Sequence, residues 1–292
     1  MANRSETQDL SAAAASFVEF LRAQKRSIST ILAYGKDISQ LVEFLNGRKI
    51  TQVASVQSEH LEQFKEYLSE EKYTLKSISR KLNSIKTFFR FLKNEGAINQ
   101  DPALSVAHPT YEIKPPRILS KMEYRALRDA CREDIRLAAI VELMLQTGIR
   151  IGELSRLQMD NIKGEEIYIE PYQSQGARSI PLNKAAKVAL DRYLVDRVST
   201  RSKNVFVTKT GRPFLARNIR AAINRYFRIA DTENASVNDL RNTWLAHHLA
   251  AGTSPVFLAK IAGHKRLTTT ERYLKYIQEK GQEKEKTRLE EL

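Results

Sequence analysis

The sequence has little of what a cross-linked, metal-binding or membrane-spanning protein needs. Cys131 is the single cysteine among 292 residues, which excludes an intramolecular disulfide and offers no cysteine metal cluster. No apolar run approaches the roughly 20 residues that cross a bilayer. The Ala12–Ala15 run lies between Asp9 and Glu19, which is unlike an export signal. We therefore expect a cytoplasmic protein without a metal site and without a membrane partner.

Acidic residues are also in short supply relative to basic ones. The chain has 34 Asp and Glu against 48 Lys and Arg, which gives a formal net charge of +14. A basic surface gains affinity for polyanions because it releases counterions from phosphates. Nucleic acid is therefore the leading candidate for a partner. The 42% hydrophobic content is enough to give one or two domains a core.

The first hundred residues carry the apolar spacing of amphipathic helices. One helix is predicted from Ser29 to Gly47 and a second from Ile78 to Gly96, since apolar residues recur at steps of three and four. The apolar positions are Ile31, Tyr34, Ile38, Leu41 and Leu45 in the first, and Ile78, Leu82, Ile85, Phe89 and Leu92 in the second. We predict a helical domain over residues 1–108.

The face of the second helix opposite its apolar positions is basic and polar. It presents Lys76, Arg80, Asn83, Thr87 and Arg90, and none of these is a carboxylate. Such a face fits a DNA groove. An ordinary solvated helix surface is the alternative, because exposed Lys and Arg are common there.

Prolines separate this helical part from the rest of the chain. Pro109, Pro115 and Pro116 break the apolar periodicity, so we predict a linker over residues 109–117. A second domain is then expected over residues 118–277, followed by a charged tail at 278–292. Ser120 and Glu123 have the spacing of a capping box at the start of its first helix.

The second domain mixes helices with short strands. An apolar helix is predicted from Asp134 to Gly148, and two alternating segments between Glu166 and Leu182 predict a β-hairpin. A third short strand is predicted at Val205–Val207, and helices return from Ala216. The predicted fold class is mainly α with a small antiparallel β-sheet.

Four side chains of this domain form a coherent chemical set. Arg150 follows the predicted helix closely, and Arg241, His264 and Tyr273 lie toward the C-terminus. A phenol is a weak nucleophile, since its unperturbed pKa is about 10. Guanidinium groups neutralise the charge that phosphoryl transfer spreads over phosphate oxygens. Two arginines, a histidine and a tyrosine are thus the parts needed to hold a phosphodiester and attack it.

The motifs around these residues resemble those of tyrosine recombinases of the phage-integrase and Xer type. Thr-Gly-Ile-Arg-Ile-Gly-Glu-Leu at 147–154 is similar to the first arginine box of that family. Residues 239–241, 262–264 and 268–273 resemble the second box at the expected intervals. The resemblance covers residues 12–277 and implies an N-terminal helical core-binding domain followed by a catalytic domain.

The resemblance also implies roles for single residues. Tyr273 would be the nucleophile that forms a 3′-phosphotyrosine, and Arg150 and Arg241 would clamp the scissile phosphate. His264 would hydrogen-bond that phosphate. Glu153 matches an acidic position that supports the arginine or the neighbouring histidine. No cofactor is implied, because the phosphotyrosine conserves the bond energy.

Two positions depart from the pattern of the family. Asn238 stands where the family generally has a histidine, and Gln173 or Ser174 stands where it has the lysine that acts as general acid. The side-chain amides of Asn238 and Gln173 do not transfer a proton near pH 7. Lys209 or Arg178 is a possible substitute for the lysine. Asn238 also suits the N-cap of a helix, which is its alternative structural role.

The resulting hypothesis is a site-specific DNA recombinase or integrase of a mobile element. It would bind double-stranded DNA and assemble as a homotetramer on paired sites, possibly together with a second recombinase. The alternative is a recombinase-like DNA-binding protein with weak or no catalysis that acts as an architectural or regulatory subunit. Relaxation of supercoils through the same intermediate is a third, weaker hypothesis. In the tail, Leu289 and Leu292 are candidates for docking on a neighbouring protomer.

Overall fold

The computed structural model describes residues 9–173, 175–232, 234–274 and 277. The chain divides into two compact units, Met1–Ile113 and Lys114–Leu292, and each is described by itself. The division falls inside the segment for which a linker is predicted. Ser174 and the tail positions Leu289 and Leu292 lie outside the described residues.

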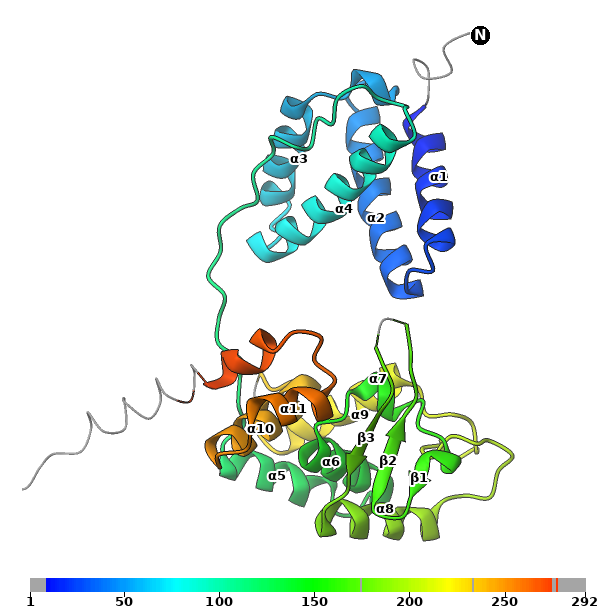
Figure 1. Ribbon diagram of the computed structural model, residues 1–292, viewed down its shortest axis with the longest axis vertical. Helices are drawn as coiled ribbons and strands as arrows, with labels where there is room; N and C mark the ends of the chain where they lie inside the picture. Colours follow the sequence, from blue (N-terminus) through cyan, green and yellow to red (C-terminus); the bar gives the residue numbers. More distant parts are fainter. Residues whose placement is uncertain (1–8, 174, 233, 275–276, 278–292) are drawn as a thin grey trace, which may run out of the picture. The chain divides into compact units, whose positions relative to one another are not determined.

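The N-terminal unit is a helical bundle (Figure 1). Its helices are α1 (Leu10–Ala23), α2 (Ile28–Asn46), the short 3₁₀ turn η1 (Val53–Ser55), α3 (Ser58–Glu70) and α4 (Leu75–Asn94). Asp9, Ser27 and Thr74 each accept a backbone N–H at the start of a helix. Both helices predicted from apolar spacing are present.

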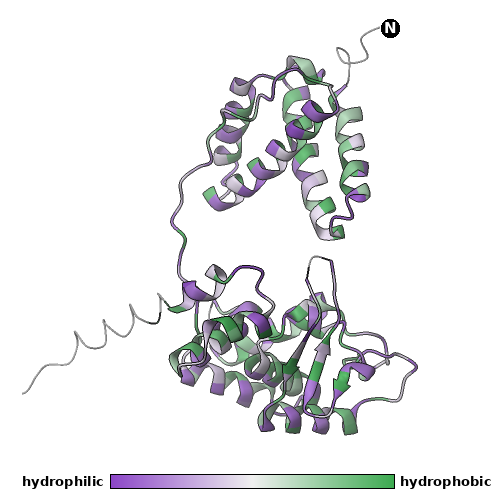
Figure 2. Ribbon diagram, in the orientation of Figure 1, coloured by the Kyte–Doolittle hydropathy of each residue, from purple (hydrophilic) through white to green (hydrophobic). Residues whose placement is uncertain are grey.

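A cluster of aromatic rings fills the core of this bundle. Phe17 and Phe88 pack edge to face with ring centroids 5.3 Å apart, and Phe88 and Phe89 do so at 5.2 Å. All three rings are fully buried. Rings of this size dominate the apolar area that a small bundle removes from water. Figure 2 shows hydrophobic and hydrophilic residues alternating along these helices.

The C-terminal unit packs helices around a three-stranded antiparallel sheet. It contains α5 (Lys121–Cys131), α6 (Ile135–Thr147), α7 (Ile151–Leu154), η2 (Met159–Asn161), β1 (Ile162–Lys163), β2 (Glu166–Ile169), β3 (Arg178–Pro181), α8 (Lys184–Asp196), α9 (Ala216–Ile229), α10 (Val237–Ala250) and α11 (Pro255–Ala262). Residues 268–274 form a further helical segment. The predicted fold class is confirmed.

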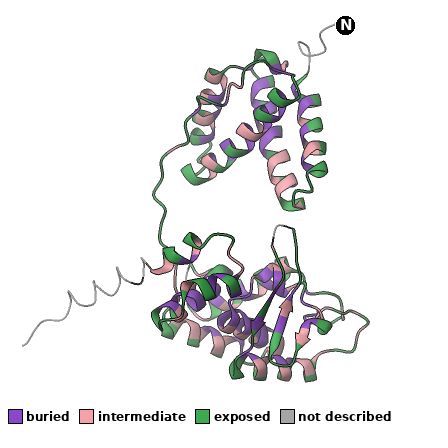
Figure 3. Cartoon of the chain, viewed as in Figure 1, coloured by how far each residue is buried: buried purple, intermediate pink, exposed green. Residues whose placement is uncertain are grey.

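Helix α6 is the centre of the C-terminal unit. It packs against α5, α8, α9 and α10, and eight of its thirteen residues are buried. Figure 3 shows this helix as a largely buried rod. Asp134 caps its first turn, and Gly148 ends it in the left-handed conformation with φ 61°. Ser120 and Glu123 form the predicted capping box of α5.

The sheet has the order β1-β2-β3. Ile167 pairs with Ile180 across β2 and β3, and both side chains are buried. The predicted hairpin is therefore present, with β2 ending at Ile169 and β3 beginning at Arg178.

The strand predicted at Val205–Val207 does not form. All three residues are buried, but the pairing here consists of the isolated bridges Gln158↔Asn204 and Val207↔Pro213. The apolar side chains of this segment are therefore explained by their burial, and no neighbouring strand among the described residues pairs with the segment. No helix among the described residues is long and apolar enough to cross a membrane.

Candidate active site

The end of α6 fixes the position of Arg150. The Cβ of any other residue at Gly148 would lie 2.2 Å from the Trp244 ring, so the chain can turn against α10 only with a glycine there. Arg150 comes two residues later as the N-cap of α7. Its side chain keeps 30% of its surface exposed. The end of the buried helix α6 thus fixes the position of the Arg150 guanidinium group, which is itself partly exposed.

Glu153 joins two guanidinium groups. Its carboxylate accepts from Arg150 Nη1 at 2.9 Å, and it accepts from Arg178 Nη1 and Nη2 at 2.9 and 2.7 Å. It also accepts the backbone N–H of Arg150 at 3.0 Å. Burial opposes ionisation, yet these hydrogen bonds and the charge of Arg178 lower the pKa of Glu153 below its ordinary value. Glu153 therefore contacts both Arg150 and Arg178.

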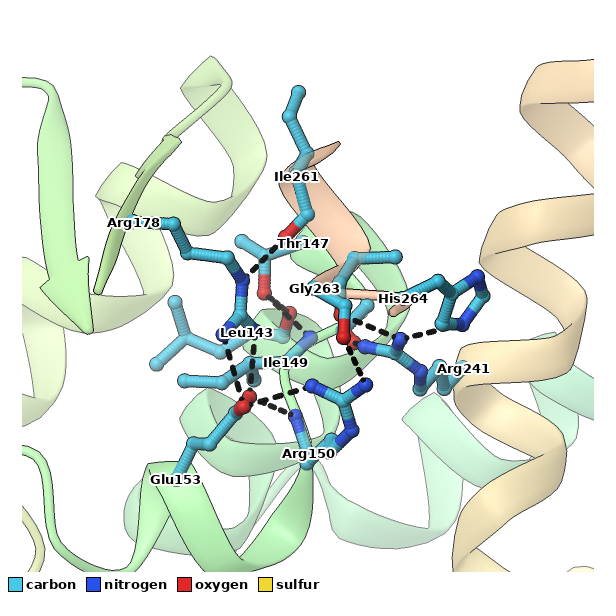
Figure 4. A network of polar contacts seen from close by, with 12 residues as sticks. Leu143, Thr147, Ile149, Arg150, Glu153, Arg178, Arg241, Ile261, Gly263 and His264 are labelled. Carbon is cyan, nitrogen blue, oxygen red and sulfur yellow. Dashed lines mark hydrogen bonds and ion pairs between the residues drawn. The ribbon is translucent and has the colours of Figure 1, made fainter. Parts of the chain in front are cut away.

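The position of Arg178 does not suit the role of a substitute for the general-acid lysine. The residue is 9% exposed, and its Nε donates to the Ile261 carbonyl at 2.5 Å. With both Nη atoms on Glu153, its guanidinium group is held in the core and is not offered to a leaving group (Figure 4). Lys209 is exposed in a turn after residue 207.

Arg241 projects from α10 into the same cluster. Its Nη1 donates to the Gly148 carbonyl, and its Nη2 donates to the Ala262 carbonyl at 2.7 Å and contacts His264 Nε2 at 2.9 Å. Burial above all, and then the nearby charge of Arg150, lower the pKa of Arg241. A buried cation whose neighbours are also cations is stabilised by an anion.

The hydrogen bonds of His264 fix its tautomer. Arginine can only donate, so Nε2 is the acceptor, and the proton of a neutral ring lies on Nδ1, which is 2.7 Å from Thr270 Oγ1. Burial, followed by the charges of Arg241, Arg150 and Arg178, lowers the pKa of His264 to about 4. The ring is therefore neutral near pH 7, with its Nε2 facing Arg241.

Gly263 lets the guanidinium groups approach the chain. It has φ 65°, and an added Cβ would lie 3.0 Å from Arg178 Cζ and 3.2 Å from Arg150 Nη1. Its carbonyl accepts from Arg150 Nη2 at 2.7 Å. Figure 4 shows Arg150, Arg178 and Arg241 arranged around this residue. The cluster contains three guanidinium groups and the carboxylate of Glu153. Its net charge is therefore positive, which favours the binding of an anion.

Tyr273 lies close to this cluster on the helical segment 268–274. Its hydroxyl donates to Asn242 Oδ1 at 2.7 Å, and its ring packs against the core. Burial raises the pKa of Tyr273, while the charge of Arg241 opposes that rise. Asn242 was not a predicted site residue. Its place directly after Arg241 is a weak signal, because only the fold brings residues 242 and 273 together.

The two positions that depart from the family pattern are exposed. Asn238 lies in the first turn of α10, and Gln173 lies in the hairpin loop with φ 54°. The alternative role of Asn238 as the N-cap of this helix is not found, because Ser236 is the N-cap and forms a capping box with Asp239. The structure brings Arg150, Arg241 and His264 into contact with one another or with Gly263. The side-chain amides of Asn238 and Gln173 form no hydrogen bond among the described residues.

The predicted DNA-binding face lies on the outside of α4. Lys76, Arg80, Asn83 and Arg90 are exposed, and Thr87 is half-buried. The face is not free of carboxylates, since the Arg80 nitrogens Nη1 and Nη2 contact the buried Asp37 of α2 at 2.6 and 2.8 Å. The helix periodicity missed this partner because Asp37 is 43 residues away in the sequence.

Comparison with known proteins places both units in one family. Residues 117–279 match the model of the phage integrase family, and residues 14–96 match that of its N-terminal SAM-like domain. The tyrosine recombinase XerC of Natranaerobius thermophilus is 30% identical over 88% of this chain and 91% of its own. The tyrosine recombinase XerD of Rickettsia bellii is 27% identical over 88% and 92%.

A solved structure shares the fold at lower identity. It is a lambda integrase tetramer bound to a Holliday junction, which has a TM-score of 0.76 and 17% identity over 90% of this chain and 79% of the integrase.

Proposed function

The chain belongs to the phage integrase family, and we propose that it is a site-specific DNA recombinase in which Tyr273 cleaves and rejoins DNA strands. The observation that carries this proposal is the cluster of guanidinium groups around Gly263, with Tyr273 near enough for the charge of Arg241 to act on its hydroxyl. A phosphodiester is the anion that such a cluster and a phenol can use together.

The phosphate is bound by the arginines in this proposal. Arg150 and Arg241 donate their remaining N–H groups to the two non-bridging oxygens, which is the planar recognition that guanidinium groups favour. Glu153 and Arg178 stay paired and hold Arg150 in place. His264 reaches the phosphate only if Nε2 carries a proton, so we propose that DNA binding raises its pKa or shifts its tautomer.

Cleavage exchanges one phosphoester bond for another. The Tyr273 oxygen forms a bond to phosphorus, and the bond from phosphorus to the 5′ oxygen breaks, which leaves a 3′-phosphotyrosine and a 5′ hydroxyl. The phenol proton is lost to water, and the leaving oxygen takes one up, so protons balance. Attack by a 5′ hydroxyl from another strand reverses each change and rejoins the DNA.

The two positions at which the family pattern has a lysine and a histidine supply no general acid to the first step. Gln173 and Asn238 stand at the positions for which the family suggests a lysine and a histidine, and neither side chain protonates a leaving oxygen. General acid-base catalysis typically contributes about 10²- to 10⁴-fold. We therefore propose that cleavage is slow in comparison with family members that carry both groups.

DNA binding and assembly follow the family in this proposal. The face of α4 with Lys76 and Arg90 contacts the duplex, and the C-terminal unit covers the scissile phosphate. The lambda integrase structure is a tetramer on a Holliday junction. We propose a homotetramer on paired sites in the cytoplasm, with a second recombinase as a possible partner, and no cofactor.

A covalent trapping experiment tests the proposal. Nicked duplexes with randomised flanks are incubated with the protein, so that the short cleaved fragment diffuses away and the protein stays joined to DNA. We expect a denaturant-resistant adduct that disappears in Tyr273→Phe and persists in a control Tyr226→Phe. Tight DNA binding without an adduct at any pH would instead support the architectural role.

A further inference from the structure

The hydroxyl of Tyr273 is engaged by a side chain whose orientation is fixed. Asn242 Nδ2 lies 3.2 Å from the Arg117 carbonyl and 3.1 Å from Asp239 Oδ1, and both of these atoms can only accept. The amide nitrogen must therefore face them, and Oδ1 must face the hydroxyl. The hydroxyl, 2.7 Å away, is then the donor.

This arrangement opposes attack on phosphorus. The phenol proton is committed to an amide oxygen, and an amide does not accept a proton near pH 7. A hydrogen bond made by the neutral form of an acid disfavours its ionisation. The hydroxyl has to leave Asn242 before its oxygen becomes a nucleophile.

We propose that Asn242 is a positioning residue that holds Tyr273 in a protonated resting state and releases it when DNA is bound. This inference rests on the proposed function of Tyr273. No chemical bond changes in the release, which exchanges one hydrogen bond of the phenol for another.

The partners of Asn242 indicate what controls the release. The Arg117 carbonyl lies at the end of the segment for which a linker is predicted, and the Arg117 side chain pairs with Glu123 at 2.6 Å. Two residues further on, the Leu119 N–H donates to Thr243 Oγ1 at 2.8 Å. The end of this segment is thus fastened to two successive residues of α10. A displacement of residues 117–119 on DNA would remove an acceptor from Asn242 and loosen its hold on the phenol.

Three charged groups of the described residues act on Tyr273. Arg241 and Asp239 face it from α10, and Arg272 precedes it on its own segment. The two arginines favour the phenolate, and Asp239 disfavours it. Neither variant described next removes any of these charged groups, so a change in the ionisation of Tyr273 reports on position 242.

The test measures that ionisation directly in the full-length protein without DNA. Tyr273 is replaced by 3-fluorotyrosine, and its fluorine resonance is followed by NMR as the pH is raised. In Asn242→Ala the neutral phenol loses its acceptor, and we expect the midpoint to fall by about half to one pH unit, equivalent to one ordinary hydrogen bond. In Asn242→Asp a carboxylate accepts from the phenol and repels the phenolate, and we expect the midpoint to rise.

Opposite shifts separate positioning from general damage to the fold. Asn224→Ala, at an exposed position of α9, is the control and should leave the midpoint unchanged. An unchanged midpoint in Asn242→Ala, or shifts of the same sign in both variants, would overturn the proposal.

Covalent trapping of the same variants connects the result to catalysis. Asn242→Ala should form the adduct faster than the parent, with its pH profile displaced toward lower pH. Adduct in the parent but no fluorine shift in Asn242→Ala would overturn the role of Asn242 alone. Opposite fluorine shifts with no adduct in any protein would overturn the proposed cleavage, and with it the release step.

Discussion

Replacement of Glu153 by glutamine tests how the guanidinium cluster is held together. The carboxylate is 7% exposed and accepts from Arg150 and from both Nη atoms of Arg178. A glutamine keeps the size of the side chain and removes its charge. One of its two ends is then an NH₂ group that faces guanidinium donors.

The expected loss is large because the remaining charges are buried. Removal of one partner of a buried ion pair typically costs about 3–5 kcal/mol, since the other charge is left uncompensated. A domain of this kind has about 5–15 kcal/mol of stability in all. We expect Glu153→Gln to lower the free energy of unfolding of the C-terminal unit by about 3 kcal/mol or more.

Glu123→Gln is a matched control within the same unit. Glu123 also closes a capping box at the third residue of a helix and also pairs with an arginine, Arg117. Its side chain is 30% exposed and that of Arg117 is 33% exposed, so this pair is worth about 0–1 kcal/mol. Glutamine serves a capping box as well, and the two variants therefore differ mainly in burial.

The assay is equilibrium unfolding in urea, followed by the fluorescence of Trp244. This is the single tryptophan of the chain, and it is buried in α10 against Gly148. Equal losses in the two variants, or a loss below about 1 kcal/mol in Glu153→Gln, would refute the reasoning from burial.

Three further predictions use other parts of the molecule. Because the pKa of His264 is lowered to about 4, the unfolded chain takes up a proton before the folded chain does as the pH falls below 6.5, and the stability due to the neutral ring is lost between pH 6.5 and pH 4. Urea midpoints should therefore fall more steeply over this range in the parent than in His264→Gln. Equal slopes would contradict the burial of this ring. Gly263→Ala should weaken DNA cleavage more than about tenfold, because the added Cβ displaces the guanidinium groups. Gly164→Ala is the control: Gly164 has φ 62° and an added Cβ would meet no atom within 4 Å, so this variant carries only the backbone strain and should cleave like the parent. Lys76→Ala combined with Arg90→Ala, which leaves the pairing of Arg80 with Asp37 intact, should weaken DNA binding and flatten its dependence on salt in a fluorescence anisotropy titration, and an unchanged slope would remove this face from the interface.

Local signals made much of the fold predictable. Asp134 and Gly148 mark the two ends of α6 by capping, and their positions in the sequence suffice to predict that Arg150 follows a helix end. The hairpin was predictable because Ile167 and Ile180 alternate with polar neighbours on short segments. In each case the information lies within a few residues of the feature.

Contacts between distant segments were not predictable from local patterns. The pairing of Glu153 with Arg178 spans 25 residues, and that of Asn242 with Tyr273 spans 31. Nothing in the neighbourhood of either residue in the sequence specifies its partner. The local sequence did not decide the cap of α10, because Ser236, two residues before Asn238, offers equally suitable chemistry. The roles of the site residues in catalysis stay predictions.

The most direct measurement of the central claim compares a charged with an uncharged scissile linkage. The rate of adduct formation is measured for the parent and for Arg150→Ala on a trapped duplex with a phosphodiester, and again with a neutral methylphosphonate at the same place. If guanidinium groups neutralise the phosphate beside Tyr273, Arg150→Ala loses about 10²-fold or more on the phosphodiester and far less on the methylphosphonate. An equal loss on both linkages would contradict the account.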